Sequence, residues 1–204
     1  MVKGIDAVIR QLIQRNNNSI NISVPAVVVG VDDLKDGFID VKPIVNFKDS
    51  VQSIPAEYPT LYNVRAVFPS TKLSTICFPV NQGDFVYLLF QSAGIQNFVS
   101  GNTEHHESIY MHFGDLSNVI AVVGFSPYQD SCFNPSNYTQ DFDNQDLNIV
   151  HNKGTDNEVA FKLTTDGDVK ITNAKKISFD CQEFEVTASE KIKFTAPLIS
   201  ENGR

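Results

Sequence analysis

Residues Val159–Ile199 read VAFKLTTDGDVKITNAKKISFDCQEFEVTASEKIKFTAPLI, and the spacing of their apolar side chains governs the fold prediction. Apolar and polar side chains alternate, which is the period expected of β-strands with one dry face. The strands are short and begin near Val169, Ile177, Phe184 and Ile192, so they recur after eight, seven and eight residues. A fixed short period of this kind is typical of a β-solenoid.

A single chain could not complete such a solenoid. Strands of three or four residues bury too little apolar surface to offset their ordering entropy, and their edges would stay unpaired. Three chains wound around a common axis solve both problems, so we predict an intertwined trimeric β-helix, a stiff needle, over residues 147–204. The alternative is an ordinary antiparallel meander in a monomer. The predicted needle core consists of Val159, Phe161, Leu163, Val169, Ile171, Ile177, Phe179, Cys181, Phe184, Val186, Ile192 and Phe194.

The N-terminal residues 1–18 predict a short amphipathic helix. Its apolar side chains recur at helical spacing, with polar residues on the other side. The helix has no helical neighbour in the sequence, so we expect its apolar stripe to dock on another protein or on a sister subunit. The alternative is that it folds back on its own chain. The stripe consists of Ile5, Val8, Ile9, Leu12 and Ile13.

Residues 19–128 predict an all-β domain. An Asp36-Gly37 dipeptide precedes the alternating run Phe38–Val45, which is a strong hairpin signal. Five or six strands in about a hundred residues suit a small Greek-key barrel of the OB type. Residues 129–146 are rich in Pro, Asn, Gln and aromatic residues without a period, and we predict a linker there.

Composition restricts the classes of function. The net charge of −8 argues against binding to nucleic acid, which needs clustered Lys and Arg. The three cysteines, Cys77, Cys132 and Cys181, lie in or beside apolar runs, so we predict buried free thiols, as in a protein folded in a reducing cytosol. We expect no signal peptide at the N-terminus and no membrane-spanning helix.

No constellation of residues predicts catalysis, a cofactor or a metal site. Adjacent side chains in His105-His106-Glu107 would point in opposite directions on an extended loop and chelate poorly. The segment Asp141–Asp146 lacks the glycine and the distal glutamate of a calcium loop. Neither a nucleophile motif nor a carboxylate pair for glycoside hydrolysis stands out. We therefore expect a protein that is not an enzyme.

Several segments resemble, in order and spacing, the N-terminal OB domain of phage central spike proteins, the membrane-piercing tips of contractile tails. They include Pro25–Val28, Gly37–Pro43, Leu61–Pro69, Cys77–Asp84 and Ala121–Phe125, within residues 20–128. The resemblance implies a homotrimer with a C-terminal three-stranded β-helix, attached to a baseplate hub protein. It implies a virion component of the tail baseplate that is assembled in the bacterial host cytoplasm and transiently punctures the host outer membrane.

The C-terminus departs from this pattern. Family members that form their own needle point tend to end in a His-X-His element that holds an iron ion, and this sequence has no histidine after His151. Either a separate tip or cap protein completes the needle, or the chain is truncated; we expect a cap. Alternatives to the phage spike are the equivalent spike of a contractile injection or secretion system, an OB-fold ligand-binding module, and a small trimeric depolymerase.

Overall fold

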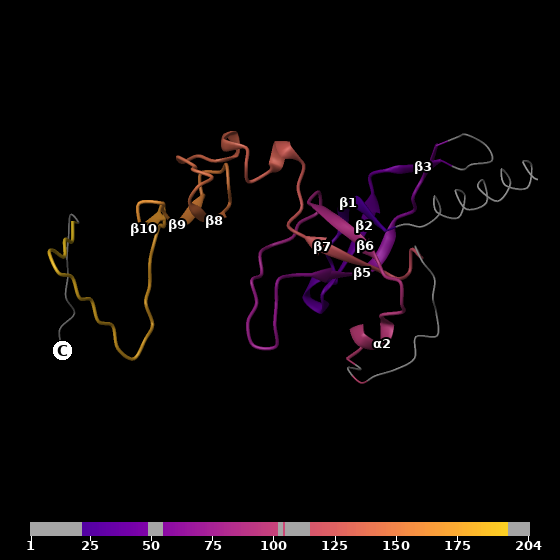
Figure 1. The fold of residues 1–204 in the computed structure, drawn as a ribbon, viewed down its shortest axis with the longest axis horizontal. Helices are drawn as coiled ribbons and strands as arrows, with labels where there is room; N and C mark the ends of the chain where they lie inside the picture. Colours follow the sequence, from indigo (N-terminus) through magenta and orange to yellow (C-terminus); the bar gives the residue numbers. More distant parts are fainter. Residues whose placement is uncertain (1–21, 49–54, 102–103, 105–114, 196–204) are drawn as a thin grey trace, which may run out of the picture. The chain divides into compact units, whose positions relative to one another are not determined.

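The computed structural model describes residues 22–48, 55–101, 104 and 115–195. The chain divides into two compact units, a barrel unit, Met1–Asn137, and a C-terminal unit, Tyr138–Arg204 (Figure 1). The division falls within residues 129–146, where the sequence predicts a linker. The predicted N-terminal helix and its docking residues lie outside the described residues, as do His105 and His106.

Five strands of the barrel unit close into a barrel. They are β1 (Ser23–Gly30), β2 (Phe38–Pro43), β5 (Leu61–Val67), β6 (Phe85–Phe90) and β7 (Val119–Val123), in the order β1-β2-β5-β7-β6. The barrel closes because β1 also pairs with β6. Four of the pairings are antiparallel, and β5 with β7 is parallel. The structure confirms the all-β class and the antiparallel pairing of the two strands that flank Asp36-Gly37.

Short elements complete the barrel unit. β3 (Asn46–Lys48) and β4 (Pro55–Glu57) form a two-stranded antiparallel sheet. The helical turns are η1 (Leu34–Asp36), α2 (Gln96–Val99), η2 (Tyr128–Asp130) and η3 (Pro135–Asn137). Gly37 ends η1 with a φ of 87°, a left-handed conformation that glycine adopts without strain, and leads directly into β2.

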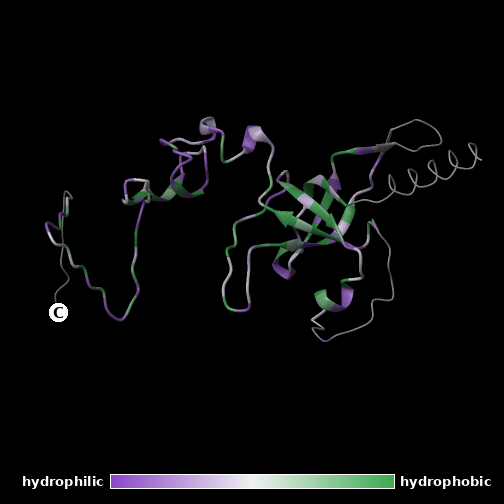
Figure 2. Ribbon diagram, in the orientation of Figure 1, coloured by the Kyte–Doolittle hydropathy of each residue, from purple (hydrophilic) through white to green (hydrophobic). Residues whose placement is uncertain are grey.

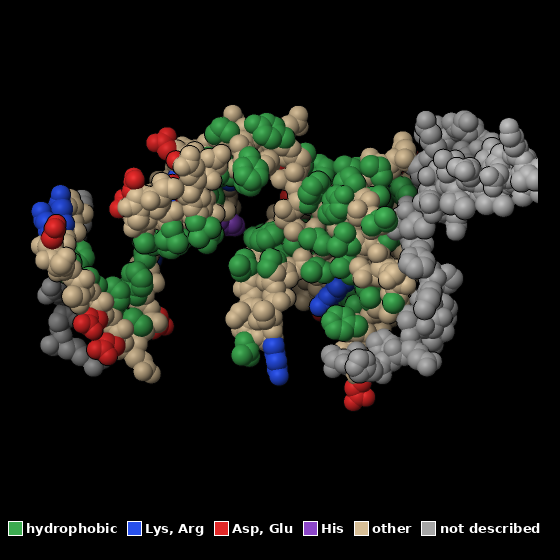
Figure 3. Space-filling model, in the orientation of Figure 1, with side chains coloured by type: hydrophobic (Ala, Val, Ile, Leu, Met, Phe, Trp, Pro, Cys, Tyr) green, Lys and Arg blue, Asp and Glu red, His purple; other side chains and the backbone are tan. Residues whose placement is uncertain are grey.

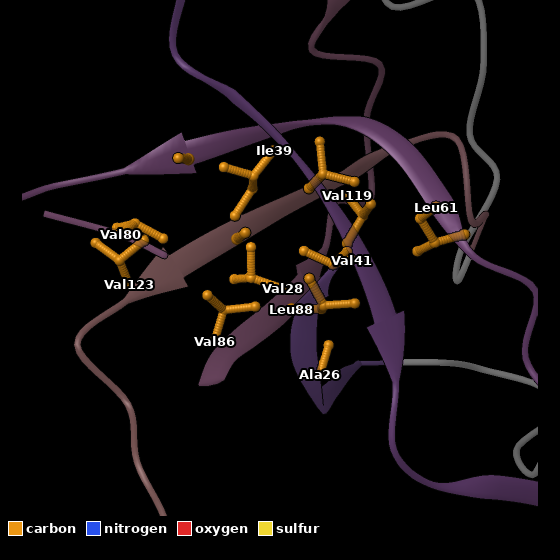
Figure 4. Close-up of a cluster of buried hydrophobic side chains, with 13 residues drawn as sticks. Ala26, Val28, Ile39, Val41, Leu61, Val80, Val86, Leu88, Val119 and Val123 are labelled. Carbon is orange, nitrogen blue, oxygen red and sulfur yellow. The ribbon is translucent and has the colours of Figure 1, made fainter. Parts of the chain in front are cut away.

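The barrel buries its own core. Alternate residues of β2, β6 and β7 are buried, as period-two strands with one dry face require. Figure 2 shows hydrophobic residues along these strands, and Figure 4 shows their side chains converging inside the barrel. The core consists of Ala26, Val28, Ile39, Val41, Leu61, Val64, Ala66, Val80, Val86, Leu88, Val119, Ala121 and Val123.

One buried amide, Asn118, connects the strand β7 to the loop after β6. Its side chain is 5% exposed, and its Nδ2 donates to the carbonyl oxygens of Gln91 at 3.1 Å and Ala93 at 2.7 Å. Its Oδ1 accepts from the backbone N–H of Ile95 at 3.3 Å. A buried amide is tolerated when its donors and acceptors are paired, so Asn118 fixes this loop against the barrel.

The C-terminal unit contains a three-stranded antiparallel sheet. Its strands β8 (Leu147–His151), β9 (Val159–Leu163) and β10 (Val169–Thr172) lie in the order β10-β9-β8. Beyond β10 the described chain is extended and forms no strand. The intertwined β-helix therefore stays a prediction, because its strands would pair with other copies of the chain. The prediction of buried thiols is wrong for Cys77 and Cys132, which are exposed. Cys181 is exposed in the single chain, and its burial in the needle core stays a prediction.

A buried carboxylate, Glu158, ties the segment before β8 to the turn between β8 and β9. The residue is 1% exposed, and its Oε2 accepts from the backbone N–H groups of Gly154 at 2.6 Å and Thr139 at 3.0 Å. Burial raises the pKa of the carboxyl, but these bonds and others from Thr139 and Gln140 outweigh it. The pKa therefore lies below the ordinary value of 4.5.

We expect Asn118→Ala to destabilise the barrel unit by about 1–3 kcal/mol, because it removes a buried amide and leaves part-buried backbone groups of the β6–α2 loop without partners. Hydrogen exchange of the amides in β6 and β7, measured by mass spectrometry, checks this. Asn97→Ala, at an exposed position of α2, is the matched control and should leave exchange in β6 and β7 unchanged. Equal protection in the two variants would contradict the role of Asn118.

A second prediction concerns pH. Because the pKa of Glu158 is lowered on folding, its carboxylate stabilises the C-terminal unit at pH values above the unfolded pKa, and this contribution is lost as the pH falls through the folded pKa. We expect protection of β8 and β9 from hydrogen exchange, corrected for intrinsic rates, to fall below pH 4.5. Glu158→Gln should weaken both the protection at neutral pH and this pH dependence. Glu190→Gln, at an exposed position, should change neither.

Candidate functional site: an exposed apolar face

One face of the C-terminal sheet is apolar and uncovered. The register places two apolar rows across the three strands. Figure 3 shows hydrophobic side chains gathered over β8–β10. Six side chains form this apolar face, with exposed fractions between 36% and 64%: Leu147, Leu163 and Val169 in one row, and Ile149, Phe161 and Ile171 in the other.

The opposite face of the sheet is more polar, yet it is the covered one. Ala160 in β9 is 1% exposed on that face. Lys162 Nζ donates to the carbonyl oxygen of Asp141, and Asn148 Nδ2 donates to that of Asp143 at 2.7 Å. The segment before β8 therefore packs on the polar face. This arrangement is the reverse of an ordinary half-buried sheet, whose apolar face is the one that packs on the core.

The chain after β10 also exposes apolar side chains. We define residues 174–195 as the extended segment. None of its residues forms a backbone hydrogen bond with another described backbone group. The rings of Phe179 and Phe184 stack with centroids 5.1 Å apart, but both side chains stay exposed. The exposed large apolar residues of the segment are Ile177, Phe179, Phe184, Val186, Ile192 and Phe194, with exposed fractions between 48% and 75%.

Charge is balanced within the extended segment. It contains four lysines and four acidic residues and is therefore neutral, although the whole chain carries −8. The lysines occur near its two ends, and the acidic residues lie between them, at 180, 183, 185 and 190. A neutral segment that alternates apolar and charged residues has no electrostatic preference for a strongly charged partner.

The predicted needle core is largely exposed in the single chain. Val159 is half-buried, and the other eleven residues are exposed in the single chain, so burial around a threefold axis stays a prediction. Leu147 and Ile149 lie on the same face but were not among the predicted core residues, although the alternation from Leu147 to His151 was a signal for them. The pattern gave no signal for Glu158.

The barrel unit contains an open pocket of about 400 Å³ between η1, β5 and the loop that follows β5. Arg65 lines it, but the guanidinium is already engaged: Nη1 donates to the carbonyl oxygen of Asp36 at 2.9 Å, and Cζ lies 5.4 Å from the centroid of the Phe38 ring. A Cβ on Gly37 would collide with Nη1, the flexible end of the Arg65 side chain, and would displace the guanidinium from this position. These contacts give Arg65 a structural role between β2 and β5.

Two kinds of feature are absent from the described residues. Within residues 22–48, 55–101, 104 and 115–195, no group of three or more His, Cys, Asp or Glu side chains is arranged to hold a metal ion. In the same part of the chain no helix has the length and hydropathy needed to cross a membrane.

Comparison with known proteins concerns the barrel. We find no match to the chain among curated proteins. Residues 24–124, about half of the chain, match the family model described as the phage protein Gp138 N-terminal domain. The matched range spans the barrel from β1 to β7. The barrel is therefore similar to the N-terminal domain of a phage protein family, and this similarity supports a phage protein and suggests a component of the virion.

Proposed function

We propose that the protein is the central spike of a contractile phage tail baseplate, a homotrimer whose C-terminal needle punctures the host outer membrane when the sheath contracts. The observation that carries this proposal is the exposed apolar face of β8–β10 together with the unpaired extended segment that follows it. Exposed apolar area of this extent marks an interaction surface in a soluble protein. A shared interior between copies would cover it.

The barrel supports the same proposal. Five strands, closed between β1 and β6 and including one parallel pair, support an OB-type barrel. The similarity of residues 24–124 to a phage domain supports a place in the virion. In the proposed role, the barrel and the N-terminal residues connect the needle to a baseplate hub protein, and a separate tip protein caps its end. The virion would be assembled in the bacterial host cytoplasm.

The proposed mechanism is mechanical and needs neither catalysis nor a cofactor. In an intertwined needle, backbone groups pair between chains, so bending it requires many hydrogen bonds to break together. Such a needle transmits axial force without deforming. The acidic character of the chain would keep the protein away from the genome in the tail above it.

The oligomeric state tests the proposal directly. Light scattering of the purified chain should give three times the chain mass of 22.7 kDa. Phe179→Asp should abolish the trimer, because three carboxylates would meet in one apolar interior. Ser178→Asp introduces the same charge one residue away, on the other side of the alternation, and should leave the trimer intact. A wild-type monomer at micromolar concentration would overturn the proposal.

Attachment to the hub gives a separate prediction. Ile9→Asp combined with Leu12→Asp should remove the apolar stripe of residues 1–18 without touching the needle. We expect the variant to remain trimeric by light scattering but to be missing from purified virions, assayed by immunoblotting. Gln11→Asp, on the polar side of the stripe, should be incorporated normally. Loss of the trimer would instead place this segment between subunits.

A further inference from the structure

Three neighbouring strands of the barrel carry apolar residues on both faces. Their inward residues belong to the core, and in strands of period two the residues between them point outward. The register pairs the outward residues across the strands, with β6 in the middle, β1 on one side and β7 on the other. We define the outer apolar face by six half-buried residues: Val27 in β1, Phe85, Tyr87 and Leu89 in β6, and Ile120 and Val122 in β7.

Charged side chains are confined to the other side of the barrel. The sequences of β1, β6 and β7 contain no Asp, Glu, Lys or Arg. The outward positions of β2 hold Asp40 and Lys42, and Arg65 lies outward on β5. The strand order places β2 and β5 between β1 and β7, opposite β6. A barrel that met water on every side would carry polar residues on all its outer strands, so we expect the outer apolar face to be covered.

Aromatic contacts extend the outer apolar face beyond the strands. The ring of Phe125, which follows β7, meets the ring of Tyr87 edge-on with centroids 5.0 Å apart, and Phe125 is itself 43% exposed. Figure 3 shows hydrophobic side chains gathered over the barrel unit. Ser23 Oγ donates to Tyr87 Oη at 3.3 Å. The phenol therefore has a hydrogen-bond partner in its own chain, and an apolar neighbour can pack on Tyr87 without leaving that hydroxyl unpaired.

Charge and tethering favour a second copy as the neighbour. The chain carries a net charge of −8, so two copies repel each other unless they meet on a surface without charge, which the outer apolar face provides. β7 ends at Val123 and β8 begins at Leu147, so only residues 124–146 would connect each barrel to the proposed needle. Short linkers would hold the three barrels of a trimer at an effective concentration on the order of millimolar. A partner from solution has no such advantage.

We infer that the outer apolar faces of the three barrels pack against one another, so that the barrels form one rigid base for the needle. The inference rests on the proposed trimer, but it concerns a surface of the barrel unit that is separate from the needle interior. The alternative is three barrels that move independently on their linkers. An independent barrel would turn on its linker under axial force, whereas a joined base would pass that force to the needle.

Site-directed cross-linking between copies of different size tests this. In the background, the three exposed natural cysteines are replaced by serine or, at Cys181 in the predicted needle core, by alanine. A full-length chain with a terminal tag carries Val122→Cys, and an untagged chain carries Val27→Cys, Leu89→Cys or Ile120→Cys. After co-expression, a short bismaleimide should join tagged to untagged chains. Trimers that are assembled separately and then mixed should give no such product, because the contact lies within one trimer.

The matched control replaces Val122→Cys with Tyr62→Cys, in β5 on the charged side of the barrel, where the natural side chain is 70% exposed. Mixed-size products that form from position 122 and not from position 62 would support the inference. A trimeric mass in light scattering without any product from position 122 would overturn it and leave the proposed spike standing. Equal products from both positions, or equal products after mixing of separate trimers, would also overturn it. A monomeric mass would overturn both proposals.

Discussion

The two units of this chain differ in how far they bury their apolar side chains. The barrel turns its alternating strands inward and buries thirteen core residues without help. The described part of the C-terminal unit has the same alternation but only three short strands, and its apolar rows stay exposed. Since apolar exposure of this extent is unfavourable, the proposed trimer would supply the cover that the described residues of one chain do not give these rows.

The orientation of the C-terminal sheet is set by polar contacts. Glu158 accepts backbone hydrogen bonds from Thr139 and Gly154, and Lys162 and Asn148 bind carbonyl oxygens of the segment before β8. These contacts hold that segment on the polar face. They leave no part of the described segment before β8 to cover the apolar face. The lowered pKa of Glu158 reflects the same bonds, which favour the charged carboxylate although it is buried.

Much of the fold was predictable because it depends on local pattern. Period-two alternation predicted the barrel strands, and Asp36-Gly37 predicted the first hairpin. The contacts of Asn118 and Glu158 were not predictable, because their partners are brought near by the folding of separate segments. Burial of Cys77 and Cys132 was predicted wrongly, since a position in or beside an apolar run does not imply burial. The needle core stays a prediction, because its burial would involve other copies of the chain.

The charges of the extended segment limit the registers in which copies of the chain could pair. Glu183 precedes Lys191 and Glu185 precedes Lys193 by eight residues, and Lys176 precedes Glu183 by seven. These intervals match the successive seven- and eight-residue repeats of the apolar pattern. Stacking of successive repeats would therefore place opposite charges next to each other on the outer surface, whereas an in-register pairing of identical residues would place like charges together. Each exposed pair would contribute little, about 0–1 kcal/mol. Their combined effect would be to favour the stacked register over its competitors, while the apolar residues between them supply the affinity.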